Sequence, residues 1–252
     1  MHRAAPRAGA STRARYEELA ARWRRRALKR LYFIAGPLLL GLIVLEGAVH
    51  HLDAWAVGLL SGGTITLCVC MSEEVPERIA RWRRGYEGEL KTAKQLAVFG
   101  RRGCVVLHDL ADRRTETYKR GNLDHVLVAP WGVFLLDSKA YRGSVTVAGD
   151  AVRVTDVDTD DESVHDRLSG AMRSRAARPH EDLLQQAGLS ARIEPVVVFW
   201  SDFEAGSVSS NGVHYVHGPK LADWIEERQR DSPVATDVQL VAARIRATRS
   251  AN

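Results

Sequence analysis

The chain has 252 residues, of which 45% are hydrophobic and 27% charged, a balance that excludes a disordered chain. Three cysteines without framework spacing exclude a disulfide-stapled secreted protein, and we interpret all three as small apolar residues in a reducing compartment. The net charge is +5, and residues 3–30 are rich in arginine; such a basic stretch can face nucleic acid or an anionic membrane surface.

Residues 1–30 are predicted to contain a basic helix. Between Ser11 and Arg30, apolar side chains recur at roughly helical spacing and arginines occupy the other faces. We interpret this segment as a juxtamembrane helix, with a nucleic-acid-binding arm as the alternative.

Residues 31–72 are predicted to form a hairpin of two transmembrane helices. The first span, 31–50, holds eleven Leu, Ile, Val or Phe residues and one charged residue, Glu46. At about −0.3 to −0.6 kcal/mol each, these side chains contribute roughly −3 to −7 kcal/mol to membrane insertion. The second span, 54–71, is uncharged but richer in glycine, and a buried or interfacial helix is the alternative.

The charges around the two spans predict their orientation. Arginines precede the first span and follow the second, whereas the loop 50–53 has no Lys or Arg. The positive-inside rule then predicts a multi-pass protein of the cell membrane, in contact with the lipid bilayer and with both termini in the cytoplasm. Gly58, Gly62 and Gly63 would allow close packing of the spans, which leaves a homo-oligomer through the transmembrane helices open.

Residues 73–252 are predicted to form a cytoplasmic α/β domain with its core at about 83–200. Helical and strand-like runs predict a mixed central β-sheet flanked by helices, and the apolar run 195–200 is expected in the middle of that sheet. A loop is expected at 156–162, and Pro179 is expected to end or kink a helix. The predicted strands are 104–108, 123–128, 133–136, 144–147, 151–155, 195–200 and 213–216, and the predicted helices are 73–99, 164–187, 221–228 and 234–248.

One predicted hairpin brings two aspartates and a lysine together. If its strands turn at residues 130–131, Asp124 faces Asp137. Because side chains alternate along a strand, Lys139 lies on the same face as both. Two facing carboxylates repel each other without a cation between them, and Mg²⁺ or Mn²⁺ prefers such oxygen ligands.

These three residue types suit phosphodiester hydrolysis, which needs an activated water and positive charge near the phosphate oxygens. Asp124 and Asp137 could hold the metal ion, and Lys139 could orient the water or stabilise the developing charge. The spacing Asp-x12-Asp-x-Lys is the one that a PD-(D/E)xK nuclease core requires. A surface ion pair on an edge strand is the alternative for Asp137 and Lys139.

Three short motifs follow one another in the predicted domain. They are Gly88-Glu89, then Asn-Leu-Asp-His-Val at 122–126, and then Gly-Val-Phe-Leu-Leu-Asp-Ser-Lys at 132–139, followed by Gly143. In this order they resemble the nuclease-related domain family, often abbreviated NERD. The resemblance covers about residues 83–199 and implies a fold similar to that of restriction-type nucleases.

The same resemblance implies a catalytic site of Glu89, Asp124, Asp137 and Lys139, with the three acidic residues as metal ligands. Glu87 competes with Glu89 for the role of the helix carboxylate. Asp137 stands where the family usually has glutamate, and the helix after the core offers no clear equivalent of the glutamine that many members carry.

Together these features predict a membrane-anchored nuclease that depends on Mg²⁺ or Mn²⁺ and hydrolyses DNA in preference to RNA. The alternative is a catalytically inactive, nuclease-like module that binds nucleic acid or a protein partner at the membrane.

Overall fold

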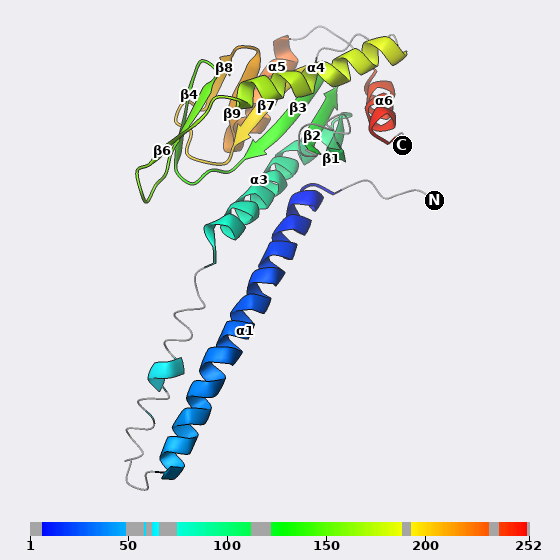
Figure 1. Cartoon of the computed structure of the whole chain (residues 1–252). Coiled ribbons are helices and arrows are strands. Elements are labelled where there is room, and N and C mark those ends of the chain that lie inside the picture. The colour runs from blue at the N-terminus through cyan, green and yellow to red at the C-terminus, as the bar shows by residue number, and fades with distance from the viewer. Residues whose placement is uncertain are drawn as a thin grey trace. The chain divides into compact units, whose positions relative to one another are not determined.

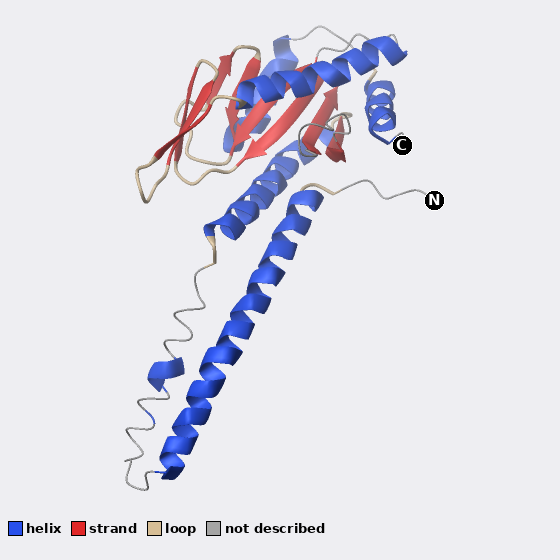
Figure 2. Ribbon diagram, viewed as in Figure 1, coloured by secondary structure: helices blue, strands red, loops and turns tan. Residues whose placement is uncertain are grey.

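The computed structural model describes residues 7–48, 58, 62–65, 75–111, 122–187, 193–231 and 237–250. The chain divides into two compact units, of which one comprises residues 1–13 and 83–252 and the other residues 14–82. Figure 1 follows the chain from the N-terminus to the C-terminus, and Figure 2 separates its helices from its strands.

The unit of residues 14–82 contains most of helix α1, which spans Ala10–Ala48. The basic stretch and the apolar stretch that follows it form this one continuous helix of 39 residues. Pro37 and Glu46 lie within the apolar part. The segment that connects it to the next long helix is described only at residues 58, 62–65 and 75–76.

The predicted localisation is wrong. Among the described residues, no helix combines the length and the apolar character that a membrane crossing needs. The apolar part of α1 is continuous with an arginine-rich part and carries Glu46, whereas a span needs about 20 predominantly apolar residues. The loop 50–53 and most of the second predicted span, 54–71, lie outside the described residues. The bilayer contact and the oligomer through transmembrane helices are therefore not supported.

The larger unit is built on a mixed six-stranded sheet in the order β1-β2-β3-β7-β9-β8. β1, β2 and β3 are antiparallel neighbours, β7 is parallel to both β3 and β9, and β8 closes the sheet antiparallel to β9. β7 therefore lies inside the sheet, as its apolar sequence predicts. The strands span Val105–Ala111 (β1), Asn122–Ala129 (β2), Gly132–Lys139 (β3), Ile193–Phe199 (β7), Ser207–Ser210 (β8) and Val213–His217 (β9).

Helices cover both faces of this sheet, so the predicted fold class is confirmed for this unit. One face packs against α3 (Glu77–Gly100) and α5 (Leu221–Asp231), which begins after the 3-10 turn Gly218–Lys220. The other face packs against α4 (Leu168–Ala187) and α6 (Val238–Ser250). Figure 1 shows α4 crossing in front of the sheet.

The side chains of β3 alternate between these two cores. Phe134 and Leu136 lie in the core of α3 and α5, while Val133 and Leu135 lie in the core of α4 and α6. The alternation predicted for the hairpin is therefore present, and it determines which helix each polar side chain of β3 can reach.

A second, three-stranded sheet consists of β4 (Ser144–Ala148), β5 (Ala151–Thr155) and β6 (Glu162–His165). The predicted hairpin between β4 and β5 is confirmed. β6 replaces the predicted loop end and helix start, because its backbone pairs with β5 although its sequence is polar. Helix α4 starts only at Leu168 and continues through Pro179 to Ala187, so Pro179 does not end it.

Candidate active site

The hairpin of β2 and β3 has the predicted register. Val128 pairs with Val133, and the ladder continues to His125 opposite Leu136. In this register Asp124 and Asp137 would be the next facing residues, but no pairing between them is formed. β2 instead continues along β1 to Asn122, and β3 continues along β7 to Lys139. The two strands therefore separate where the acidic residues lie.

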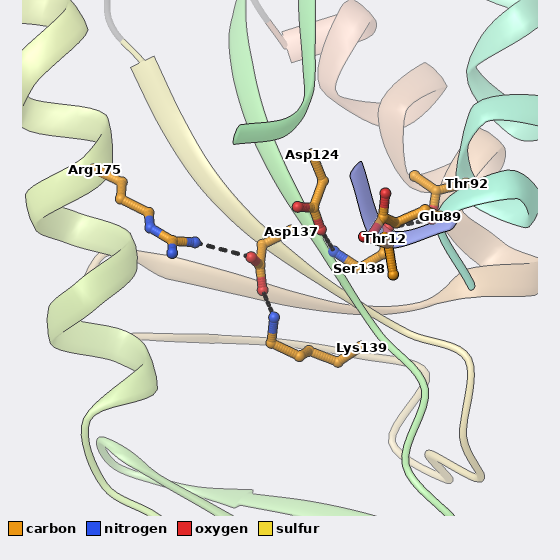
Figure 3. A network of polar contacts seen from close by, with 8 residues as sticks. All are labelled: Thr12, Glu89, Thr92, Asp124, Asp137, Ser138, Lys139 and Arg175. Carbon is orange, nitrogen blue, oxygen red and sulfur yellow. Dashed lines mark hydrogen bonds and ion pairs between the residues drawn. The ribbon is translucent and has the colours of Figure 1, made fainter. Parts of the chain in front are cut away.

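The Asp124 side chain bridges this separation. The backbone N–H of Ser138 donates a hydrogen bond of 2.9 Å to Asp124 Oδ2 (Figure 3). A side-chain carboxylate thus accepts a bond that a backbone carbonyl would accept in a continued ladder. This bond holds the Asp124 carboxylate beside the segment Asp137–Lys139.

Asp137 is the most enclosed charge of the site, with 4% of its surface exposed. Its two oxygens have different cationic partners: Arg175 Nη1 donates to Oδ1 at 3.0 Å, and Lys139 Nζ contacts Oδ2. Burial acts to raise the pKa of Asp137, but the charges of Lys139 and Arg175 outweigh it and lower the pKa. Asp137 is therefore ionised at neutral pH.

The pKa values of Asp124 and Lys139 are both raised, but for different reasons. Burial and the charge of Asp137 raise the pKa of Asp124 well above its ordinary value. Burial acts to lower the pKa of Lys139, but the charges of Asp137 and Asp124 outweigh it and raise that pKa. Lys139 is therefore a cation at neutral pH, and 30% of its side chain is exposed.

Glu89 approaches from α3, on the opposite side of the sheet from α4. The Thr12 hydroxyl donates a hydrogen bond of 2.5 Å to Glu89 Oε1, and only 7% of Glu89 is exposed. Burial raises the pKa of Glu89, although the hydrogen bond from Thr12 and the charge of Lys139 partly offset this. Figure 3 shows Glu89 beside Thr12 and Thr92, away from Arg175.

Glu87 points elsewhere. It pairs with Arg83 at 2.8 Å on the same helix, and both side chains are exposed to solvent. Of the two glutamates that the sequence left open for the helix carboxylate, Glu89 is the buried one. The charges of Asp109 and Asp137 act on its carboxyl group.

Polar contacts attach α3 to the end of β3. The Thr92 and Ser138 hydroxyls lie 2.7 Å apart, and Trp200 Nε1 donates to Thr92 Oγ1 at 2.8 Å. Gly88 permits this approach, because a Cβ there would lie 3.2 Å from Ala140 Cβ and 3.4 Å from the Trp200 ring. The part of α3 that carries Glu89 is thereby held against the strand that carries Asp137.

The structure brings Asp124, Asp137 and Lys139 together, but it does not add Glu89 as a third ligand. Within the described parts of the chain, no group of three His, Cys, Asp or Glu side chains is placed to hold one metal ion. The two carboxylates that the structure brings beside each other, and that could hold a metal here, are those of Asp124 and Asp137.

Sequence reasoning missed three of the contacts made at or near this site, namely those of Arg175, Thr12 and Ser11. Arg175 lies in a predicted helix, but nothing in its spacing indicates that it reaches Asp137. The N-terminal segment contributes Thr12, and also Ser11, whose N–H and hydroxyl donate to Asp109 at 2.9 and 2.7 Å. Asp109 has a positive φ of 50° in β1, which is uncommon for a non-glycine residue and carries no signal in the sequence.

A pair of histidines lies on the neighbouring strands β1 and β2. His108 and His125 face each other on β1 and β2 with their Nδ1 atoms 2.7 Å apart. One nitrogen must donate and the other accept, so the pair holds complementary neutral tautomers. The pKa of His125 falls to about 3, through burial first and the charge of His108 second.

Residues 84–200 match the family model of the nuclease-related domain. The predicted resemblance is confirmed, and this segment is called the nuclease-related domain below. It extends from α3 to the residue after β7, so it contains Glu89, Asp124, Asp137, Lys139 and Arg175 but not Thr12. Neither the curated proteins nor the solved structures provide a match to the chain.

Proposed function

We propose that the nuclease-related domain hydrolyses phosphodiester bonds of DNA with the help of Mg²⁺ or Mn²⁺. The observation that carries this proposal is the meeting of Asp124, Asp137 and Lys139 where β2 and β3 separate. DNA is proposed ahead of RNA because the resemblance is to restriction-type nucleases. The match of residues 84–200 supports the nuclease-related character of the domain.

The residues present suit a hard divalent cation. Asp124 and Asp137 offer carboxylate oxygens, and Mg²⁺ is commonly held by one or two carboxylates with water completing the shell. The raised pKa of Asp124 indicates a carboxyl group whose ionised form lacks enough positive charge nearby. A cation bound between the two aspartates would remove that deficit. When bound, such an ion supplies Lewis acidity that activates water and stabilises charge on a phosphate.

The chain's own side chains supply the remaining chemistry. Lys139 stays protonated at neutral pH, so its role is to stabilise negative charge on the phosphate oxygens and not to act as a general base. Asp137 fixes the ammonium through their ion pair. Both residues belong to one buried strand that is paired with β7 up to Lys139, which keeps their relative positions rigid.

Plasmid nicking by the full-length chain tests the proposal. We expect the wild type to nick supercoiled DNA with Mg²⁺ or Mn²⁺ and to stop when the ion is chelated. Lys139→Met should abolish nicking while circular dichroism shows an intact fold. Lys94→Met is the matched control, because Lys94 is an exposed lysine of α3, and it should nick normally. Unchanged nicking by Lys139→Met would show that Lys139 has no role in the reaction and would contradict the proposed mechanism.

A specific observation favours a second function, a non-catalytic module that binds nucleic acid or a protein partner. Asp137 already has two cationic partners, and the described residues offer no three-ligand group. This module would bind its partner with the divalent ion chelated and without cleavage. Binding that falls steeply with salt would indicate nucleic acid, since phosphate contacts release counterions, and a flat response would indicate a protein.

A further inference from the structure

We propose that Arg175 is a built-in cation that occupies Asp137 and competes with the divalent ion for it. The inference rests on the proposed function, because it concerns the same pair of aspartates. It makes metal binding an exchange, in which the Arg175 guanidinium leaves Asp137 as the ion arrives.

The contacts of Asp137 carry this inference. Oδ1 accepts a hydrogen bond from Arg175 and Oδ2 contacts Lys139, so neither oxygen is without a cation. Asp137 is almost fully buried, which leaves little room for a third positive partner. An ion that binds this carboxylate must therefore displace a resident cation or share an oxygen with it.

Arg175 is the partner that can move away. Lys139 sits two residues from Asp137 on the same strand, and the backbone of that strand is paired with β7. Arg175 reaches the carboxylate from α4, a separate element, and 31% of its side chain is exposed. A long side chain at that exposure can turn its guanidinium into water, where it stays solvated.

The charges of the site favour the exchange once an ion is present. With Arg175 and Lys139 both in place, the negative charge of ionised Asp137 is balanced, whereas the pKa of Asp124 stays raised. A divalent ion between the aspartates would balance the charge of both carboxylates. The Arg175 guanidinium contacts Oδ1 of Asp137 and does not do this. The cost of the exchange is one charge-assisted hydrogen bond, a strong contact that should weaken metal binding about tenfold or more.

Calorimetric titration of the full-length chain with Mn²⁺ tests this. Arg175→Gln should bind Mn²⁺ at least about tenfold more tightly than the wild type. Arg173→Gln is the matched control, because it removes the same charge from the same helix. Arg173 pairs with Asp150 and the Asn211 carbonyl, not with Asp137. The affinity of the Arg173→Gln variant for Mn²⁺ should therefore stay near that of the wild type.

The outcomes separate the inference from the proposed function. One outcome is that the wild type binds Mn²⁺, Asp124→Asn does not, and Arg175→Gln binds it no more tightly than the wild type. In that case Arg175 does not compete with the ion, and only this inference fails. Equal tightening in Arg173→Gln would overturn it as well, since the effect would then be one of general charge. If no variant binds Mn²⁺, the inference and the metal-dependent function fail together.

A second measurement covers the case in which Arg175→Gln does not fold. The Nε–H signal of Arg175 can be followed in ¹⁵N spectra of the wild type and assigned by its loss in Arg175→Lys. Addition of Mg²⁺ should move this signal toward that of a solvent-exposed arginine. A signal that stays unchanged while Mg²⁺ binds at Asp124 would show that the guanidinium never leaves.

Discussion

The Asp124 carboxylate accepts the backbone N–H of Ser138 at 2.9 Å, at the point where the ladder between β2 and β3 ends. One side chain thus has two roles: it completes the hydrogen bonding of β3 and provides an acidic group to the candidate site. These roles can be separated by substitution, because an amide oxygen accepts a hydrogen bond but carries no charge.

Asp124→Asn should therefore keep the fold while losing affinity for a divalent ion. Its amide oxygen can still accept the Ser138 N–H, and the repulsion from Asp137 disappears, so the free energy of unfolding should not fall. Asp124→Ala should lower it by about 1–3 kcal/mol, because the N–H loses its partner. Urea unfolding at neutral pH measures both values. Equal destabilisation by Asn and Ala would show that the carboxylate's charge, and not its acceptor role, supports β3.

Thr12→Val should raise the pKa of Glu89 above its value in the wild type. The Thr12 hydroxyl donates to the glutamate and favours its ionised form, whereas valine has a similar shape and no donor. A ¹³C titration of the Glu89 carboxyl measures the change. Thr12→Ser keeps the hydroxyl and should behave like the wild type; a pKa that is the same in Thr12→Val would mean that this contact does not form in solution.

The His108–His125 pair should make the fold sensitive to acid. The pKa of His125 is lowered from 6.5 to about 3, so between these values the unfolded chain binds a proton that the folded one does not. Stability is therefore complete above the unfolded pKa and falls as pH decreases, by up to about 1.4 kcal/mol per pH unit. Burial lowers the pKa of His108 too, which adds to the effect.

Replacement of His125 tests this dependence directly. His125→Asn cannot take up the proton, so its free energy of unfolding should fall less steeply between neutral and mildly acidic pH. Denaturant unfolding at a series of pH values gives the slopes for the variant and the wild type. Parallel slopes would contradict the proposed neutrality of His125 in the fold.

Gly143→Ala should destabilise the nuclease-related domain by roughly 3 kcal/mol or more, because it adds both backbone strain and a clash. Gly143 has a φ of 116°, and a Cβ there would lie 1.9 Å from the Thr155 carbonyl oxygen. Gly149 is the control: its φ is 61°, but no atom lies within 4 Å of its Cβ position. Gly149→Ala should lower the free energy of unfolding only through the strain of the left-handed conformation, by about 1–2 kcal/mol. Thermal unfolding that ranks the two alike would refute the steric argument.

The hairpin of β2 and β3 shows how much of the site could be predicted. Its register depends on the period of two in the apolar residues and on a turn of two residues, and both are local properties of the sequence. That Asp124, Asp137 and Lys139 share one face follows from this register without knowledge of any other element, although the ladder ends before the two aspartates pair. The α/β class and the inner position of β7 follow in the same way from apolar patterning.

In two segments the local composition does not predict the structure that the chain adopts. The apolar half of α1 has the residue types of a span, yet it continues an arginine-rich helix, and the described helices include none fit to cross a membrane. β6 has a polar sequence that predicts no strand, but β5 offers it a free edge for backbone pairing. In both cases, the neighbouring structure outweighed the local composition.

By itself, the sequence determined that Asp124, Asp137 and Lys139 share one side of the hairpin, because side chains alternate along each strand. It did not determine that the ladder ends before the two aspartates can pair. The tertiary structure decided what those charges contact. Arg175 reaches Asp137 across 38 positions of sequence and Thr12 reaches Glu89 across 77. Such contacts depend on how helices pack on the sheet, and the period of a single helix does not specify which distant carboxylate its polar side chains will meet.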